Sequence, residues 1–337
     1  MIGVDLGTTH VRIHIKGRGV VLREPAVIAI AEGTLDVKAV GDEAYRMLGR
    51  TPGSIVAVRP LANGVIADYT LTERMLKAFL GKVLTGAGRF LRPTIMVCIP
   101  SAITEVERRA VLQALHEIGA RKALLIEEPV AGAIGAGIDI AQPLGSMVID
   151  MGGGTTDIAI ISLGGIVVSE SVRVAGNQFD EDIVAWVKDR HNLLIGDRTA
   201  EEIKRMVGAA ALDPDEEAAE IDVRGRDLID GMPKTVRVST HDVIEALEAS
   251  LERIAAALRK VLEQAPPELV SDVIDRGIVM TGGTSQLRNL DRYLSLVSGI
   301  PVFVADEPED CVVVGTSRAL EMADILQDAR QRGGVFD

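Results

Sequence analysis

Cysteines, long apolar runs and basic residues are all scarce in this chain of 337 residues. The two cysteines, Cys98 and Cys311, lie in apolar, strand-like stretches, which is typical of buried thiols in a reducing compartment and excludes a disulfide scaffold or a zinc module. The longest uncharged stretches reach about a dozen residues, whereas a membrane-spanning helix needs about 20. The first residues enter an apolar strand without the features of a signal peptide, so we expect a cytoplasmic protein.

The shortage of basic residues has a second consequence. Lysines and arginines number 36 against 49 acidic residues, so the formal net charge is −13. This balance argues against a nucleic-acid partner, which needs a basic surface. The charge is segregated, however, because residues 1–100 hold 13 basic and 8 acidic side chains, a balance of +5 that leaves −18 for the rest. The amino-terminal part can therefore still face an anionic surface.

An internal repeat organises the chain. Residues 2–24 align with residues 148–170 when Asp5 is set against Asp150. Each copy predicts an apolar strand ending in Asp, a turn of Gly and Thr, a β-branched strand, a second turn and another apolar strand. A strand–helix–strand–helix order follows in both halves. The sequence therefore predicts an α/β fold of two homologous halves, each a mixed sheet flanked by helices, around a cleft.

The expected elements after each repeat copy can be placed by their patterns. They are a strand at 94–99, a helix at 104–118, a strand at 123–126, a strand at 277–280, a helix to about 297, a strand near 301–306 and a last helix from 311 to about 326. We expect subdomain I to comprise residues 1–138 and 311–337, and subdomain II residues 139–310. Insertions at about 33–68 and about 177–240 would form smaller outer parts of each.

Turns rich in glycine and threonine follow both repeated aspartates and are candidate phosphate loops. Their residues are Gly7, Thr8 and Thr9 in the first copy, and Gly152, Gly153, Gly154, Thr155 and Thr156 in the second. Glycines let backbone N–H groups approach phosphate oxygens, and threonine hydroxyls add donors. Asp5 and Asp150 would point carboxylates at one place, which suits Mg²⁺ held through waters. One such turn alone is usually an ordinary hairpin bend, but two equivalent copies indicate loops facing each other across a cleft.

Two further residue pairs follow apolar strands in the strand–helix–strand–helix parts of the two halves. Gly282 and Gly283 open a helix, so their amides can meet a ligand at its N-terminus. Glu127 and Glu128 are adjacent carboxylates, and we expect at least one to face the cleft and polarise a water for attack on a terminal phosphate. The alternative is a solvated helix N-terminus, where acidic residues are favoured electrostatically.

These motifs resemble the actin/Hsp70/sugar-kinase superfamily and, more closely, the MreB/Mbl family of bacterial actins. The resemblance runs nearly end to end and is carried by GVDLGTT, LREPAVIAI, GRTPGSIVAVRPLANGVIADY, LIEEPVAGAIGAG, VIDMGGGTTDIAIISLGG, LLIGDRTAEEIK and PPELVSDVIDRGIVMTGG. It implies a slow, Mg²⁺-dependent ATPase that cycles between ATP and ADP and assembles with itself into filaments. It also implies a peripheral location at the inner face of the cell membrane, anionic lipid contacts, and membrane-bound wall-synthesis and shape proteins as partners.

The same resemblance implies roles for single residues. Glu128, immediately before Pro129, looks like the residue that positions the attacking water, with Asp150 and Thr155 beside it. The phosphate loops are 5–9 and 150–156. On the ribose and adenine side of the nucleotide, the residues that resemble the family's are Gly176, Asp180, Glu201 and Lys204. Those that resemble the residues closing over the α-phosphate and base are Gly282 and Gly283.

The chain departs from the family pattern in two places. Thr9 and His10 stand where a small residue and Asn are usual, and Thr284 stands where the third loop usually has another glycine. These departures favour an alternative, a paralogue that binds nucleotide and co-assembles with little turnover. Arg12 lies seven residues after Asp5, where actin has a phosphate-contacting lysine, but strand alternation can point it elsewhere, so we do not count it in the site.

One short segment resembles the family's membrane-insertion loop: Arg89, Phe90, Leu91 and Arg92. Its apolar pair can enter the headgroup boundary while the arginines contact anionic lipids. Alternatively, the apolar pair packs at the start of the strand that follows. One loop binds weakly, so stable attachment needs a filament presenting many copies. The competing class of function is a non-polymerising sugar kinase or chaperone-like ATPase, although only about ten residues follow the last expected helix, too few for a peptide-binding domain.

Overall fold

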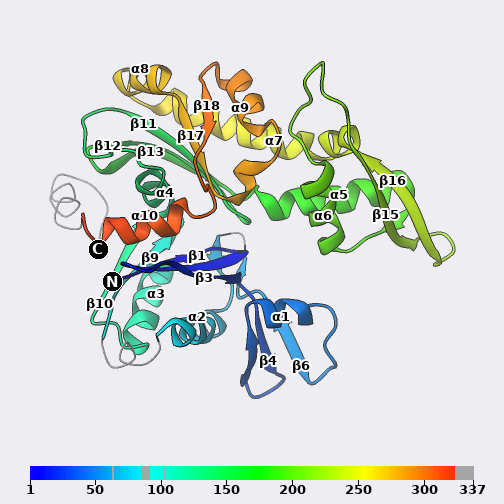
Figure 1. The fold of residues 1–337 in the computed structure, drawn as a ribbon, viewed down its shortest axis with the longest axis horizontal. Coiled ribbons are helices and arrows are strands. Elements are labelled where there is room, and N and C mark those ends of the chain that lie inside the picture. The colour runs from blue at the N-terminus through cyan, green and yellow to red at the C-terminus, as the bar shows by residue number, and fades with distance from the viewer. Residues whose placement is uncertain (63, 85–91, 102, 323–337) are drawn as a thin grey trace.

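The computed structural model describes residues 1–62, 64–84, 92–101 and 103–322. Two five-stranded mixed sheets dominate it (Figure 1), with the orders β10–β9–β1–β2–β3 and β18–β17–β11–β12–β13. The strands of the first are β1 (Ile2–Leu6), β2 (His10–Ile15), β3 (Gly19–Pro25), β9 (Thr94–Ile99) and β10 (Lys122–Glu127). Those of the second are β11 (Ser146–Met151), β12 (Thr156–Ser162), β13 (Gly165–Val172), β17 (Ile278–Thr281) and β18 (Val302–Val304). The matching orders confirm the two homologous halves that the repeat predicts.

Helices α4 (Glu128–Gly135) and α10 (Cys311–Ala319) lie between the two sheets and join them (Figure 1). One apolar cluster includes residues of both helices and of β9, β10, β11 and β12. The two helices approach closely because Gly135 and Gly315 lie at their contact, where a Cβ atom on either would overlap the other helix's backbone. Gly3 of β1 lies close to the backbone of Ser317, because a Cβ atom there would be 2.8 Å from the Ser317 nitrogen. Glycines therefore allow α4, α10 and β1 to pack closely where the two halves meet.

Amphipathic helices cover the outer faces of the sheets. The first sheet is covered by α2 (Tyr69–Val83) and α3 (Glu105–Glu117), through residues such as Phe79 and Leu115. The second is covered by α5 (Gly176–His191), α7 (Thr240–Gln264), α8 (Pro267–Arg276) and α9 (Leu290–Ser298), with Phe179 in the core. Helix α3 begins where the sequence predicts, because Thr104 and Glu107 form a capping box.

Two smaller sheets extend from these halves. One contains β4 (Ile28–Ala31), β5 (Val37–Val40) and β6 (Ile55–Val58) with helix α1 (Asp42–Met47). It therefore includes a strand that precedes the expected insertion at 33–68. The other contains β14 (Leu193–Leu194), β15 (Glu220–Asp227) and β16 (Pro233–Ser239), beside α6 (Asp197–Val207). A short hairpin of β7 (Leu61–Ala62) and β8 (Val65–Ile66) lies closer to the cleft.

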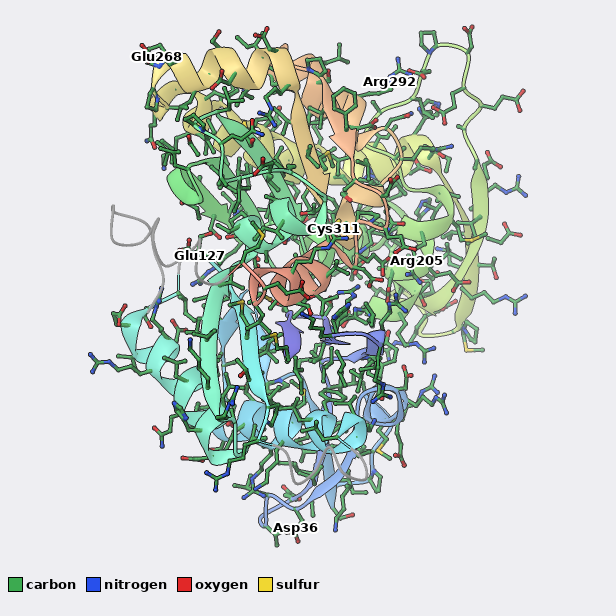
Figure 2. All side chains as sticks on the ribbon, turned by 60° about the vertical axis from the view of Figure 1, so that its left-hand side comes forward. Asp36, Glu127, Arg205, Glu268, Arg292 and Cys311 are labelled. Carbon is green, nitrogen blue, oxygen red and sulfur yellow. The ribbon has the colours of Figure 1, made fainter. Side chains whose placement is uncertain are left out.

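The cysteine-bearing stretches differ from each other in structure. Cys98 lies in β9 as expected, and Cys311 begins α10, which confirms the helix expected from residue 311 and overturns the strand-like interpretation of the same stretch. Figure 2 shows Cys311 near the middle of the molecule, with Asp36 and Glu268 at opposite ends. The described part of α10 ends at Ala319, and residues 323–337 lie outside the described residues. Among the described helices, none combines the length and apolarity needed to span a membrane.

Candidate functional site

The two predicted phosphate loops lie against each other. A Cβ atom on Gly153 would overlap the side chain of Thr9, and one on Gly154 would overlap that of Thr8. Any larger residue at these positions would force the loops apart. Asp5 lies in the strand before the first loop, and Asp150 lies in the strand before the second. The structure therefore brings both repeated aspartates and both Gly/Thr loops together.

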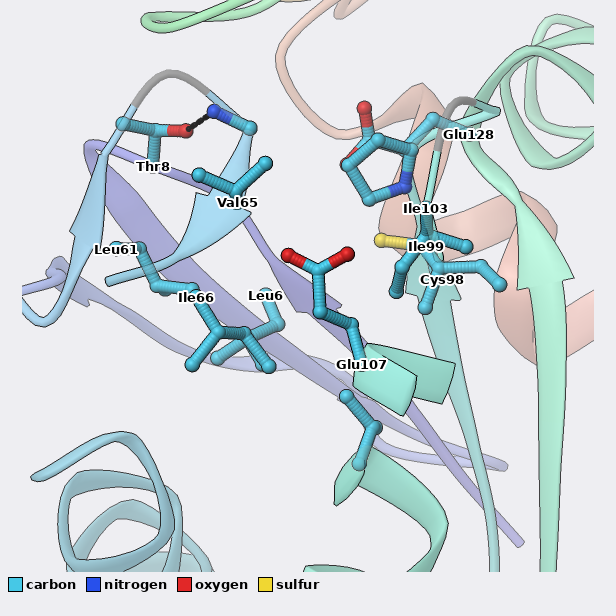
Figure 3. A pocket seen from close by; sticks show the side chains of 13 residues that line it. Leu6, Thr8, Leu61, Val65, Ile66, Cys98, Ile99, Ile103, Glu107 and Glu128 are labelled. Atoms are coloured by element: carbon cyan, nitrogen blue, oxygen red, sulfur yellow. Dashed lines mark hydrogen bonds between the residues drawn. The ribbon is translucent and has the colours of Figure 1, made fainter. Parts of the chain in front are cut away.

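A third turn, which the sequence did not indicate, closes over both loops. The N–H of Gly64, between β7 and β8, donates a hydrogen bond of 3.0 Å to Thr8 Oγ1 (Figure 3). Gly64 has a φ of 74°, and a Cβ atom there would overlap the Thr155 side chain. Only glycine fits this combination of backbone angle and close approach. The hairpin therefore contacts one threonine of each loop, Thr8 in the first and Thr155 in the second.

Three carboxyl groups named by the sequence are buried around these loops. Asp5, Glu128 and Asp150 are at most 8% exposed. Burial raises the pKa of Asp150 to about 7, although the Thr281 hydroxyl donates to its Oδ1 at 2.5 Å. Burial also raises the pKa of Asp5, against the attraction of Arg12, and raises that of Glu128 well above its usual range. Buried acids of this kind are stabilised as carboxylates by a bound cation, which suits Mg²⁺.

Arg12 belongs to this cluster, and the expectation that strand alternation turns it away is wrong. It lies directly opposite Asp5 in the β1–β2 pair, so both side chains emerge on one face. Its Nη1 is 3.4 Å from Asp5 Oδ2, and its Nη2 is 3.1 Å from Glu309 Oε2. The pairing could have been found by counting outward from the Thr8–Thr9 turn. The site thus contains a largely buried guanidinium group besides its acids.

Glu309 and Asp310 are functional candidates that no sequence signal revealed. Both precede α10, about 300 residues after Arg12. Arg12 Nε is 3.7 Å from Asp310 Oδ1, and Arg23 Nε donates to the same oxygen at 3.0 Å. Gln286, just after the third glycine turn, donates to Glu309 Oε1 at 2.8 Å. These contacts tie the first sheet to the turns of the second half.

The residues expected on the ribose and adenine side form a second group. Lys204 Nζ is 2.8 Å from Asp180 Oδ1 and donates to the Gly176 carbonyl at 2.7 Å. Burial outweighs the attraction of Lys204 and raises the pKa of Asp180 to about 6. Glu201 is turned the other way, accepting a hydrogen bond of 3.5 Å from the Tyr45 hydroxyl of α1. Three of the four residues are therefore together, and the fourth reaches the small sheet of the first half.

The third loop is held to the second by its unusual threonine. The Thr284 hydroxyl donates to the Gly152 carbonyl at 2.7 Å, and a Cβ atom on Gly176 would overlap Thr284 Oγ1. Gly282 has a φ of 82° and lies against the backbone of Met151. Gly283 lies beside Glu309. All three glycine-bearing turns therefore line one region, as their sequence positions suggest.

A small cavity adjoins the loops on the side of α3. Its volume is about 30 Å³, room for about two water molecules, and its lining includes Thr8, Cys98, Glu107 and Glu128 (Figure 3). Figure 3 shows the Glu107 carboxyl group pointing into it from the start of α3. The cavity therefore offers room for a water molecule beside Glu128.

The predicted membrane loop lies away from this site in the chain. Arg89, Phe90 and Leu91 lie outside the described residues, and Arg92 is exposed. The proposed roles of these residues stay predictions.

Comparison with known proteins gives a consistent result. The family model "MreB/Mbl protein" matches residues 1–328. The cell shape-determining protein Mbl of Bacillus subtilis is 50% identical over 325 residues, covering 96% of this chain and 97% of that protein. MreB of Escherichia coli is 48% identical over 330 residues, covering 96% and 94%.

Solved structures agree with the sequence comparison. The crystal structure of MreB5 of Spiroplasma citri bound to ADP has a TM-score of 0.89 and 36% identity, and covers 98% of both chains. The same protein bound to AMPPNP has a TM-score of 0.90 and 36% identity, and covers 97% of both. The chain therefore has the actin-like fold and belongs to the MreB/Mbl family of cell shape-determining bacterial actin homologues.

Proposed function

We propose that this protein binds ATP between its phosphate loops, hydrolyses it slowly, and assembles with itself into filaments at the inner face of the cell membrane. The observation that carries the proposal is the contact between the two loops beside a cavity that Thr8 and the buried Glu128 both line. The S. citri relative, which was solved with ADP and with AMPPNP, supports a nucleotide as the ligand.

The residues present fit a nucleotide with a divalent cation. Gly153 and Gly154 leave no room for side chains, so backbone N–H groups can approach phosphate oxygens there. Thr8 and Thr155 add hydroxyl donors beside them. Asp5 and Asp150 would hold Mg²⁺ through waters, and the ion, when bound, supplies positive charge that offsets the charge developing on the phosphate oxygens.

Glu128 would accept a proton from the attacking water. It is the first residue of α4, with Pro129 behind it, so a fixed helix end sets its position. The water oxygen forms a bond to the terminal phosphorus while the bond from phosphorus to the bridging oxygen breaks and ADP leaves. The water's proton passes to Glu128 and from there to the released phosphate. The Gly64 turn, which is hydrogen-bonded to Thr8, would shield this reaction from bulk water.

Assembly can respond to the nucleotide through the joint between the halves. Helix α4 carries Glu128 at one end and packs on α10, which also contacts β1. A change at the terminal phosphate therefore reaches the packing between both sheets. Curated relatives that determine cell shape support a role for such filaments in organising wall synthesis and rod shape. The predicted loop with Phe90 and Leu91 would attach them to anionic lipid.

Sedimentation combined with phosphate release tests this function. With ATP and anionic liposomes, the protein at tens of micromolar should pellet and release phosphate slowly. Protein that stays in the supernatant under these conditions would refute assembly, and pelleting without phosphate release would refute turnover. ADP in place of ATP is the matched control.

One observation favours a second candidate, a family member with little turnover. The Thr284 hydroxyl holds the third loop to the carbonyl of Gly152, so opening between these loops has to break a partly buried hydrogen bond. Product release would then be slow even where nucleotide binds well. A single-turnover measurement that shows rapid hydrolysis followed by slow ADP release distinguishes this candidate from slow chemistry.

A further inference from the structure

Asp157 is a buried carboxyl group that the proposed hydrolysis by Glu128 does not use. It lies in β12 with 1% of its surface exposed. Burial raises its pKa, and the nearby polar groups of Ser171, Thr155 and Ser101 lower it in part. Neither of its carboxyl oxygens, however, has a hydrogen-bond partner of normal geometry within the residues that the structure describes. Leaving a buried carboxyl group unpartnered is costly, so a native chain that retains one indicates a use for it.

The register of the second sheet turns Asp157 towards the cleft. It lies directly opposite Asp150 in the antiparallel β11–β12 pair, so both side chains emerge on the same face. The equivalent residue in the first half is Arg12, opposite Asp5. Arg12 is paired with three carboxylates, whereas Asp157 forms no ion pair in the described part of the chain. The two hairpins thus flank the loops with opposite charges.

Asp157 also lies on the side of its sheet that packs against α4, the helix that Glu128 begins. Among the three acids that raise the pKa of Glu128, Asp157 has a larger effect than Asp150 or Asp5. Along β12, Asp157 lies on the same face as Ala159 and Ile161, which belong to one apolar cluster with Val130 and Ala131 of α4. Asp157 also raises the pKa of Glu127, the residue before Glu128. The unpartnered oxygens therefore lie on the side of the loops where Glu128 begins α4.

We propose that Asp157 positions the attacking water together with Glu128. A water molecule has two O–H groups, and two acceptors at fixed places orient both of them. Glu128 accepts one hydrogen bond and takes that proton during attack, while Asp157 accepts the other and remains unchanged. The free lone pair then points at the terminal phosphorus, whose bond to the bridging oxygen breaks. Asp157 is a positioning residue in this scheme, and the inference rests on the proposed ATPase function.

The test is single-turnover phosphate release, with nucleotide affinity measured separately using AMPPNP. Asp157→Ala should lower the rate by about 100-fold, and Asp157→Asn by about 10-fold, because the amide keeps one acceptor oxygen. The dissociation constant for AMPPNP should change by less than about threefold in both. Ser171→Ala removes a neutral neighbour of the same carboxyl group and is the matched control, which should keep the wild-type rate.

A double variant separates positioning from a structural role. If Asp157 and Glu128 hold one water, adding Asp157→Ala to Glu128→Gln should cost little beyond Glu128→Gln alone. The proposal would be overturned if the two substitutions multiplied their separate losses of rate in the double variant. It would also be overturned if Asp157→Asn lowered the rate, the AMPPNP affinity and the thermal midpoint in parallel. A wild-type rate in Asp157→Ala would also overturn it. Failure of the wild-type protein to hydrolyse ATP would instead refute the proposed function.

Discussion

Replacing Gly315 with alanine tests the joint between the two halves. A Cβ atom at this position of α10 would overlap the Ala131 carbonyl oxygen and the Gly135 nitrogen of α4. These are backbone atoms, so no side-chain rotation can relieve the overlap, and the helices have to move apart. We expect an overpacking cost of about 3 kcal/mol, the upper end of the usual range. Alanine's better helix propensity offsets about 1 kcal/mol, which leaves a net loss of about 2 kcal/mol.

Gly81→Ala is the matched control. Gly81 lies in α2 and is exposed, and a Cβ atom added there would have no neighbouring atom within 4 Å among the described residues. The same substitution there should stabilise the protein by about 0.5–1 kcal/mol. At about 2 °C per kcal/mol for a chain of this size, thermal unfolding should show a midpoint lower by about 4 °C for Gly315→Ala and higher by about 1–2 °C for Gly81→Ala. Equal shifts of one sign in both variants would refute the close-contact argument.

The remaining predictions concern the site. Glu128→Gln should lower phosphate release by about 100-fold while AMPPNP still binds, whereas Glu127→Gln should stay near wild type; the reverse order would move the catalytic role to Glu127. Thr284→Gly should speed ADP release, measured by displacement of a fluorescent ADP, because it removes the bond to Gly152; slower release would exclude this restraint. Burial raises the pKa of Asp150 from 3.8 to about 7, so in the nucleotide-free protein its contribution to stability is complete below pH 3.8 and is lost as pH rises through 7. Affinity for Mg²⁺–ATP should then rise between pH 6 and 8, by at most about tenfold per unit below 7, and Asp150→Asn should flatten this profile; a flat wild-type profile would contradict the assignment. Replacing both Phe90 and Leu91 with Ser should abolish liposome pelleting and leave nucleotide binding intact; undiminished pelleting would favour packing of these residues in the protein.

The fold was largely predictable because its repeat is written in local patterns. Asp5 and Asp150 each end an apolar strand before a Gly/Thr turn, and this fixes where two equivalent hairpins begin. The strand–helix–strand order that follows predicts the parallel neighbours of each hairpin. The stretch at Cys311 fitted both a strand and the expected last helix, because apolar β-branched residues suit a buried helix as well as a strand, and the structure shows the helix.

The site was predictable only where its residues carry a local signal. The loop glycines and Glu128 stand at strand ends, where a pattern is visible. Arg12 and Asp157 needed the hairpin register, which the turn positions imply and which strand alternation alone obscures. Gly64 and Glu309 come from segments whose approach to the loops depends on tertiary packing. No local pattern predicts such contacts, because the two partners are distant in the chain.

Electron microscopy of the protein on an anionic lipid monolayer examines filament assembly and membrane contact together. With ATP and Mg²⁺, the wild-type protein should form filaments that lie along the lipid, and the variant with both Phe90 and Leu91 changed to Ser should leave the lipid bare. Isolated particles without filaments, from wild-type protein that binds and hydrolyses ATP, would contradict filament assembly at the membrane.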